Sequence, residues 1–161
     1  MDKKVAIVMG SESDLKIMKG ACEVLEQFEV GFVVRILSAH RTPEQVISWV
    51  EELNANDYQV IIAGAGGAAH LAGVIAAHTI LPVIGVPVSS SLQGMDALLS
   101  TVQMPGGIPV AAVGIDRSKN AALWQKGLLI NLSHRRKILF LCLAAHVLIM
   151  EFLPVSKLKE L

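Results

Sequence analysis

The sequence predicts an α/β fold: a three-layer α/β/α sandwich around a doubly wound parallel sheet, with a C-terminal helix. Two observations predict it. Short, continuous apolar runs rich in Val and Ile recur along the chain, and helical patterns fill the stretches between them. Continuous runs, unlike alternating ones, are typical of parallel strands that are buried on both faces. The alternation of strand and helix then requires right-handed crossovers, which place helices on both faces of the sheet.

The apolar runs predict strands at residues 5–9, 32–37, 60–63, 82–86 and 110–113. Helices are predicted over residues 14–28, 43–54, 68–77, 94–102 and 118–129. Ser11 or Ser13 is suited to cap the first helix, because a short hydroxyl side chain accepts a free backbone N–H there. At the second helix, Thr42 is expected to cap, Pro43 takes the first helical position and Gln45 completes a capping box.

The composition bounds the class of protein. The chain has 161 residues and a mass of 17.2 kDa, which predicts a single domain over residues 1–161. Lys and Arg together number 14, as do Asp and Glu, so no basic excess favours nucleic-acid binding. Hydrophobic residues make up 53% of the chain, which argues against disorder. Cys22 and Cys142 lie far apart and no secretory signal is visible, so a cytoplasmic location is expected.

The chain divides into a core of about residues 4–130 and a tail of about residues 131–161. In the tail, a basic triplet at 135–137 precedes an apolar run at 138–150. The run is shorter than the roughly 20 residues that span a bilayer, and it contains His146. We therefore expect a helix that is buried in the core or between subunits, and no membrane anchor.

The segments after the first three predicted strands carry the candidate chemistry. They are residues 10–14 (GSESD), 38–43 (SAHRTP) and 64–70 (GAGGAAH). Because ligands of open α/β sheets bind beyond the carboxyl ends of the strands, these three loops are expected to meet at one edge. Their convergence, more than any single loop, indicates a site for a small molecule.

The first two loops combine an anion-binding helix start with a proton-transfer residue. Serine hydroxyls and a helix N-terminus suit a phosphate, whereas Asp14 suits a ribose hydroxyl; the alternative is that these residues only cap the helix. In the second loop, the His40 imidazole suits proton transfer near neutral pH. The Arg41 guanidinium suits bidentate contact with a phosphate. The alternative for this loop is a surface pair at the start of a helix.

The third loop is rich in glycine. Gly64, Gly66 and Gly67 allow the backbone to approach a ligand closely and to offer its amides. Neither a Walker A loop nor a dinucleotide fingerprint is present, because the Lys is absent and the last glycine is misplaced. His70 is expected in the first turn of the following helix, as a site residue or as a packed histidine. No His or carboxylate pair has metal-ligand spacing, so no metal is predicted.

Five motifs resemble a known family when taken in order. They are residues 10–14, 38–43, 63–71, 85–88 (GVPV) and 102–110 (VQMPGGIPV). They resemble the class I 5-(carboxyamino)imidazole ribonucleotide mutases of purine biosynthesis, over roughly residues 4–130. The resemblance implies a flavodoxin-like domain in a homo-octamer, with no cofactor and no metal. The reaction that it implies moves the substrate's carboxylate from nitrogen to ring carbon 4, which is a step toward IMP. The resemblance also implies a functional link to the synthetase that makes this substrate.

The resemblance also implies roles for the matching positions. His40 resembles the general acid/base that moves a proton at the ring carbon. The residues that resemble binders of the ribose and phosphate are Ser11, Asp14 and Arg41. The residues that resemble the lining of the site, including the wall around the carboxylate and the transient CO₂, are Ser38, Ala65, Gly66, His70 and Leu71. The chain departs from the family at Ala72, where relatives usually have proline, and in its apolar tail.

Two other functions stay open from the sequence. A carboxylase of the same fold takes free CO₂, but its class lacks the 66–70 run seen here, which favours the mutase. A non-enzymatic nucleotide-binding module is the second, and it leaves His40 unexplained. A flavin carrier is disfavoured because only 4% of the residues are aromatic. The expected partner is thus a small ribonucleotide, with neither nucleic acid nor membrane.

Overall fold

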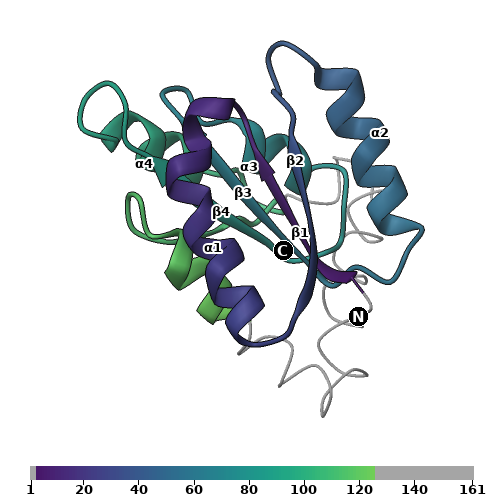
Figure 1. The fold of residues 1–161 in the computed structure, drawn as a ribbon. Coiled ribbons are helices and arrows are strands. Elements are labelled where there is room, and N and C mark those ends of the chain that lie inside the picture. The colour runs from purple at the N-terminus through teal and green to yellow at the C-terminus, as the bar shows by residue number, and fades with distance from the viewer. Residues whose placement is uncertain (1–2, 126–161) are drawn as a thin grey trace, which may run out of the picture.

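The structure, a computed structural model, describes residues 3–125 (Figure 1). Its strands are β1 (Lys3–Met9), β2 (Gly31–Ile36), β3 (Val60–Gly66), β4 (Val83–Val88) and β5 (Ala111–Ala112). Its helices are the 3₁₀ turn η1 (Glu12–Asp14), α1 (Leu15–Gln27), α2 (Pro43–Asn54), α3 (Leu71–Ala76) and α4 (Met95–Val102), followed by helical residues 118–125. Each of the five predicted strands, and each of the five helices predicted before the tail, has a counterpart in this part of the chain.

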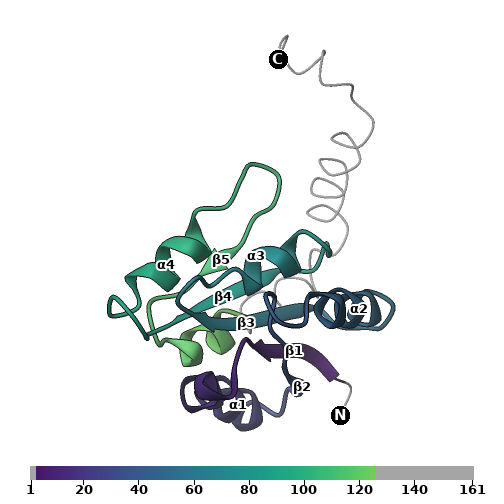
Figure 2. The ribbon, with the colours of Figure 1, turned by 90° about the horizontal axis from the view of Figure 1, so that it is seen from above.

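The strands form one sheet in the order β2-β1-β3-β4-β5, and every neighbouring pair is parallel. The register aligns Ile7 of β1 with Val34 of β2 on one side and with Ile62 of β3 on the other. Figure 2 shows three layers: α1 and the helical residues 118–125 cover one face of the sheet, and α2 and α3 cover the other. The strand order is that of flavodoxin-like folds, so the predicted α/β/α sandwich is confirmed.

β1 is buried on both faces because its side chains alternate between two apolar cores. Ile7 belongs to one buried cluster with Met18 of α1. Its neighbour Val8 belongs to the other, with Trp49 of α2 and Ile75 of α3. The two helical layers therefore pack against the same strand, and close packing on both sides fixes the position of the loop at its carboxyl end.

The third helix begins later than predicted. It starts at Leu71 rather than at residue 68, because β3 extends to Gly66 and Gly67 then turns with φ +64°. This left-handed conformation suits glycine and ends the strand. His70 is therefore the N-cap of α3 and not a residue of its first turn. Residues 67–70 therefore form a loop between β3 and α3, and this loop lies at the edge of the sheet.

The side-chain caps predicted for the first two helices are not formed on α1 or α2. Ser11 caps the 3₁₀ turn η1, in a capping box with Asp14, whereas α1 itself begins after Asp14, which makes no side-chain capping bond. Thr42 is the N-cap of α2, but its hydroxyl bonds to Ser38 and makes no capping bond to the helix. The expected capping box with Gln45 is therefore absent, because the Thr42 hydroxyl closes the preceding loop instead.

Residues 126–161 and residues 1–2 lie outside the described part of the chain. The end of the fifth predicted helix, the apolar helix expected at 138–150 and Cys142 fall there. In the described residues 3–125, no helix is long and apolar enough to cross a membrane.

Candidate active site

A cavity of about 350 Å³ opens at the carboxyl ends of β1, β2 and β3, among the loops that follow these strands. β1 lies between β2 and β3, so this is the point where the strand order reverses. Nine predicted site residues line it: Ser11, Asp14, Ser38, His40, Arg41, Ala65, Gly66, His70 and Leu71. The three predicted loops therefore meet at one place.

The first loop presents a buried carboxylate in a fixed orientation. The Asp14 carboxylate accepts from the backbone N of Ser11 at 3.1 Å and from the hydroxyl of Ser13 at 3.3 Å. Burial raises the pKa of Asp14 above its usual range, and these hydrogen bonds and a nearby guanidinium oppose the rise. The carboxylate is thus a hydrogen-bond acceptor whose charge depends on this local balance.

The second loop is closed on itself and tied to the first. The Oγ1 of Thr42 accepts from the backbone N of Ser38 at 3.1 Å, and the Oγ of Ser38 accepts from the backbone N of Arg41 at 3.2 Å. The Arg41 side chain crosses to the first loop, where its Nη2 donates to the carbonyl of Gly10 at 2.9 Å. A guanidinium has five N–H donors, so this bond orients Arg41 and leaves capacity to bind an anion.

The third loop is anchored by α4 and lies close to the loop after β4. The backbone N of Ala69 donates to the hydroxyl of Ser100 at 3.2 Å. That hydroxyl donates to the carbonyl of Asp96 in its own helix and lies 3.3 Å from the carbonyl of Gly67. A Cβ on Gly66 would lie 3.1 Å from the hydroxyl of Ser90. The absence of a side chain at Gly66 therefore allows the two loops to pack together.

His40 and His70 meet at the cavity from different loops. The Nε2 of His40 lies 2.9 Å from the Nδ1 of His70, and the rings are edge to face with centroids 5.0 Å apart. In such a contact one ring nitrogen donates and the other accepts, so the tautomer of one ring is matched to that of the other. Both side chains are exposed, and the pair can hold a proton where a ligand can reach it.

Ser90 also lines the cavity, and the sequence reasoning missed it. Ser90 follows β4 closely, so the rule that located the first three loops would have found it at the end of the fourth strand. The remaining lining residues are Gly10, Ser13, Ala39, Gly67 and Ala68. They belong to the three predicted loops and extend their walls.

The cavity suits an organic ligand with hydroxyl and anionic groups. It combines a carboxylate, a guanidinium, serine hydroxyls and two imidazoles with a glycine-rich wall. Among residues 3–125, no group of three or more His, Cys, Asp or Glu side chains is arranged to hold a metal ion. The side chains that line the cavity can form hydrogen bonds, pair with charges and transfer protons.

The fold and the site define a class: a flavodoxin-like α/β protein whose strand ends hold an imidazole pair beside a polar ligand cavity. The family model for AIR carboxylase matches residues 4–135, which include all three loops. The chain belongs to this family.

Curated relatives include enzymes with two different names. The N5-carboxyaminoimidazole ribonucleotide mutase of Pyrococcus abyssi is 60% identical over 121 residues, which cover 74% of this chain and 70% of the relative. The mutase of Thermotoga maritima is 54% identical, with 74% and 71% covered. The phosphoribosylaminoimidazole carboxylase of Saccharomyces cerevisiae is 57% identical over 120 residues, which cover 74% of this chain but 21% of that protein.

A solved structure of the same fold is that of Treponema denticola PurE. It superposes with a TM-score of 0.73 at 31% sequence identity, and the match covers 98% of this chain and 95% of that one. The likeness agrees with the strand order described above.

Proposed function

We propose that the chain is an N5-carboxyaminoimidazole ribonucleotide mutase, an isomerase of de novo purine biosynthesis. It moves the carboxylate of 5-(carboxyamino)imidazole ribonucleotide from nitrogen to ring carbon 4, giving 4-carboxy-5-aminoimidazole ribonucleotide. One observation carries the proposal: His40, Arg41 and Asp14 reach one cavity from two separate loops, in a chain 60% identical to a mutase.

The first two loops bind the ribose and the phosphate. Arg41, oriented by its bond to the Gly10 carbonyl, pairs with the phosphate, and the hydroxyl of Ser11 donates to the same group. The Asp14 carboxylate accepts hydrogen bonds from the ribose hydroxyls. The imidazole ring then lies toward the third loop, where Ala65 and Gly66 leave room for the carboxylate.

The reaction needs one proton to change position. The bond between nitrogen and the carboxyl carbon breaks, which gives CO₂ and leaves the nitrogen to gain a proton. Carbon 4 then attacks the CO₂, and the new carbon–carbon bond requires carbon 4 to lose its own proton. His40 gives the first proton and takes the second, so it ends in the state in which it began. His70, at 2.9 Å, orients the His40 ring for both transfers.

The protein's main contribution to the rate is confinement. Carbon dioxide that stays beside carbon 4 reacts as an intramolecular partner, which greatly raises its effective concentration. The walls of the third loop and of Leu71 exclude water and delay escape. Confinement and a single acid/base account for the reaction without a cofactor.

The chain acts as one domain, 1–161, in a cytoplasmic homo-octamer that takes its substrate from the synthetase of the preceding step. Support for self-association comes from exposed apolar side chains at helical spacing on and before α4: Leu92, Met95, Leu99 and Val102. Apolar faces of this kind are typical of subunit interfaces. Light scattering tests the octamer, because the mass in solution must be about eight times that of the chain.

The test of the function is an ultraviolet assay with 5-(carboxyamino)imidazole ribonucleotide and no added bicarbonate. The wild type should isomerise the substrate, and His40→Asn should lose about 10²–10⁴-fold in turnover while still binding it. His78→Asn is the matched control, since His78 is exposed and does not line the cavity. Turnover only with aminoimidazole ribonucleotide and high bicarbonate would identify a carboxylase instead. Binding without any turnover would identify a nucleotide-binding module.

A further inference from the structure

We propose that Asp116, which lies outside the cavity, is a positioning residue that holds the loop after β4 so that Ser90 closes the wall beside Gly66. The inference rests on the mutase function proposed above and adds to it the control of CO₂ retention. Asp116 lies in the turn before the helical residues 118–125, well beyond the third loop in the sequence.

The contact between Asp116 and this loop is bidentate. The backbone N of Ser89 donates to Oδ1 of Asp116 at 2.8 Å, and the hydroxyl of Ser89 donates to Oδ2 at 2.6 Å. The backbone N of Asp116 donates in turn to the carbonyl of Pro87 at 2.9 Å. Asp116 thus contacts the residues on both sides of Val88, the last residue of β4.

Asp116 makes these bonds from the left-handed backbone conformation. Its φ is +60°, in the region that glycine adopts freely and that aspartate and asparagine tolerate better than other residues do. A glycine at this position would keep the conformation and lose the clamp. The carboxylate contact with Ser89 gives a physical reason for an aspartate here.

Ser90 is the link between this clamp and the cavity. It directly follows Ser89 and lines the cavity, and its hydroxyl lies 3.1 Å from where a Cβ on Gly66 would be. Beyond Ser90 the chain turns through three consecutive residues with positive φ, beginning at Leu92, whose side chain is 74% exposed. Leu92 packs into no core, so the two hydrogen bonds from Ser89 to Asp116 restrain the chain directly before Ser90.

The wall of Gly66 and Ser90 faces the part of the cavity proposed for the carboxylate and CO₂. When the wall is closed, CO₂ released from nitrogen remains beside carbon 4 and forms the new bond. When the wall is loosened, CO₂ leaves, and the protonated amine departs as 5-aminoimidazole ribonucleotide. Asp116 therefore sets the partition between carboxylate transfer and release of CO₂.

The experiment measures this partition in Asp116→Gly. Purified protein is mixed with 5-(carboxyamino)imidazole ribonucleotide, and both 4-carboxy-5-aminoimidazole ribonucleotide and 5-aminoimidazole ribonucleotide are quantified, with an enzyme-free sample subtracted. Loss of a charge-assisted clamp should raise the ratio of released to transferred product about tenfold. Ser89→Ala should give a smaller rise in this ratio. In the Asp116→Gly background it should add little, because the two substitutions remove the same contact.

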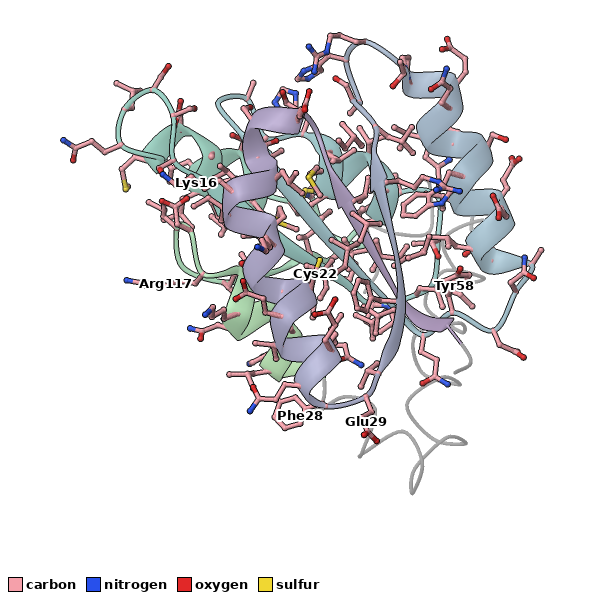
Figure 3. All side chains as sticks on the ribbon, in the orientation of Figure 1. Lys16, Cys22, Phe28, Glu29, Tyr58 and Arg117 are labelled. Atoms are coloured by element: carbon pink, nitrogen blue, oxygen red, sulfur yellow. The ribbon has the colours of Figure 1, made fainter. Side chains whose placement is uncertain are left out.

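Two further variants separate positioning from stability. Asp116→Asn tolerates the left-handed conformation and can bond to both groups of Ser89, so it should restore a partition close to that of the wild type. Glu29→Gly is the matched control. Glu29 also has a positive φ, +56°, but it lies past the C-terminal end of α1, away from the loops at the carboxyl ends of the strands (Figure 3). It should leave the partition unchanged.

The outcomes distinguish this proposal from the function on which it rests. A wild type that does not isomerise the substrate overturns the mutase function itself. A wild type that isomerises it, with an unchanged partition in folded Asp116→Gly, overturns the role of Asp116 alone. An equal rise in Glu29→Gly would likewise overturn it, because the effect would then follow from the change to glycine and not from the clamp.

Discussion

The Nε2 of His40 lies 2.9 Å from the Nδ1 of His70, although thirty residues separate them in the sequence. The second loop supplies one ring and the third loop supplies the other, and each loop has its own anchor. Ser38 and Thr42 close the loop of His40, while Ser100 of α4 holds the loop of His70 through Ala69. The pair is therefore a property of the assembled sheet edge and not of either loop.

The pair predicts that His70→Asn slows turnover through His40. Loss of the ring that orients His40 should remove about 1–2 kcal/mol of transition-state stabilisation, a fall of about 5–30-fold in kcat, with a smaller change in KM. A kinetic double-mutant cycle with His40→Asn provides the check. Because the two rings act as one unit, the double variant should be scarcely slower than His40→Asn alone. Independent, additive losses would contradict the coupling.

A second prediction concerns the planar guanidinium group of Arg41. In Arg41→Lys the charge remains, but the bond to the Gly10 carbonyl and the bidentate geometry are lost. The KM for the ribonucleotide should rise about tenfold or more, with less effect on kcat, because phosphate binding is the interaction removed. Arg117→Lys is the control, since Arg117 projects from the surface at a distance from the cavity (Figure 3). Equal effects of the two variants would exclude a phosphate-binding role for Arg41.

A third prediction follows from the raised pKa of Asp14. Burial makes the folded chain hold this proton more tightly than the unfolded chain, so protonation of Asp14 stabilises the fold at acidic pH. That contribution is lost as the pH rises through the folded-state pKa. Substrate binding has the opposite dependence, because only the ionised carboxylate accepts two ribose hydroxyls.

The KM of the wild type should therefore rise as the pH falls through this pKa, while the free energy of unfolding gains the Asp14 contribution. Asp14→Asn should have a raised KM that no longer changes over this pH range, and its unfolding should lose the same pH dependence. KM and urea unfolding, measured in parallel from about pH 4 to pH 7, provide the check. Asp57→Asn is a matched exposed control. A KM that keeps its wild-type pH dependence in Asp14→Asn would disprove the role.

The parallel sheet and the position of the site at its edge could be predicted from the sequence. Both follow from short apolar runs and from the residues that directly follow them. Continuous apolar runs such as residues 60–63 indicate buried parallel strands, and parallel strands bring their carboxyl ends to one edge. The loops of His40 and His70 were predicted to meet for this reason. Their direct contact was not, because it depends on the φ of Gly67 and on an anchor from α4.

Hydroxyl partners were the least predictable feature. Thr42 precedes Pro43 in a pattern typical of a side-chain cap, yet its hydroxyl bonds to Ser38. A local pattern cannot show which of two nearby backbone groups a hydroxyl selects, since the choice depends on the path of the loop. The role of Asp116 was missed for a related reason: its contact with Ser89 joins segments that lie far apart in the sequence.

A last prediction concerns the packing of the sheet against α4, the helix that anchors the third loop. A Cβ on Gly85 of β4 would overlap the Cγ2 of Thr101, a buried β-branched side chain whose hydroxyl already bonds to the Ala97 carbonyl. Thr101 has little freedom to move, so Gly85→Ala should lower the free energy of unfolding by about 1–3 kcal/mol. Gly106→Ala is the matched control, because a Cβ there meets no atom within 4 Å and should change stability by less than about 0.5 kcal/mol. Urea unfolding of the two variants beside the wild type measures both effects. Since α4 also carries Ser100, Gly85→Ala should lower kcat as well, and unaltered stability in this variant would show that β4 and α4 are packed less tightly than described.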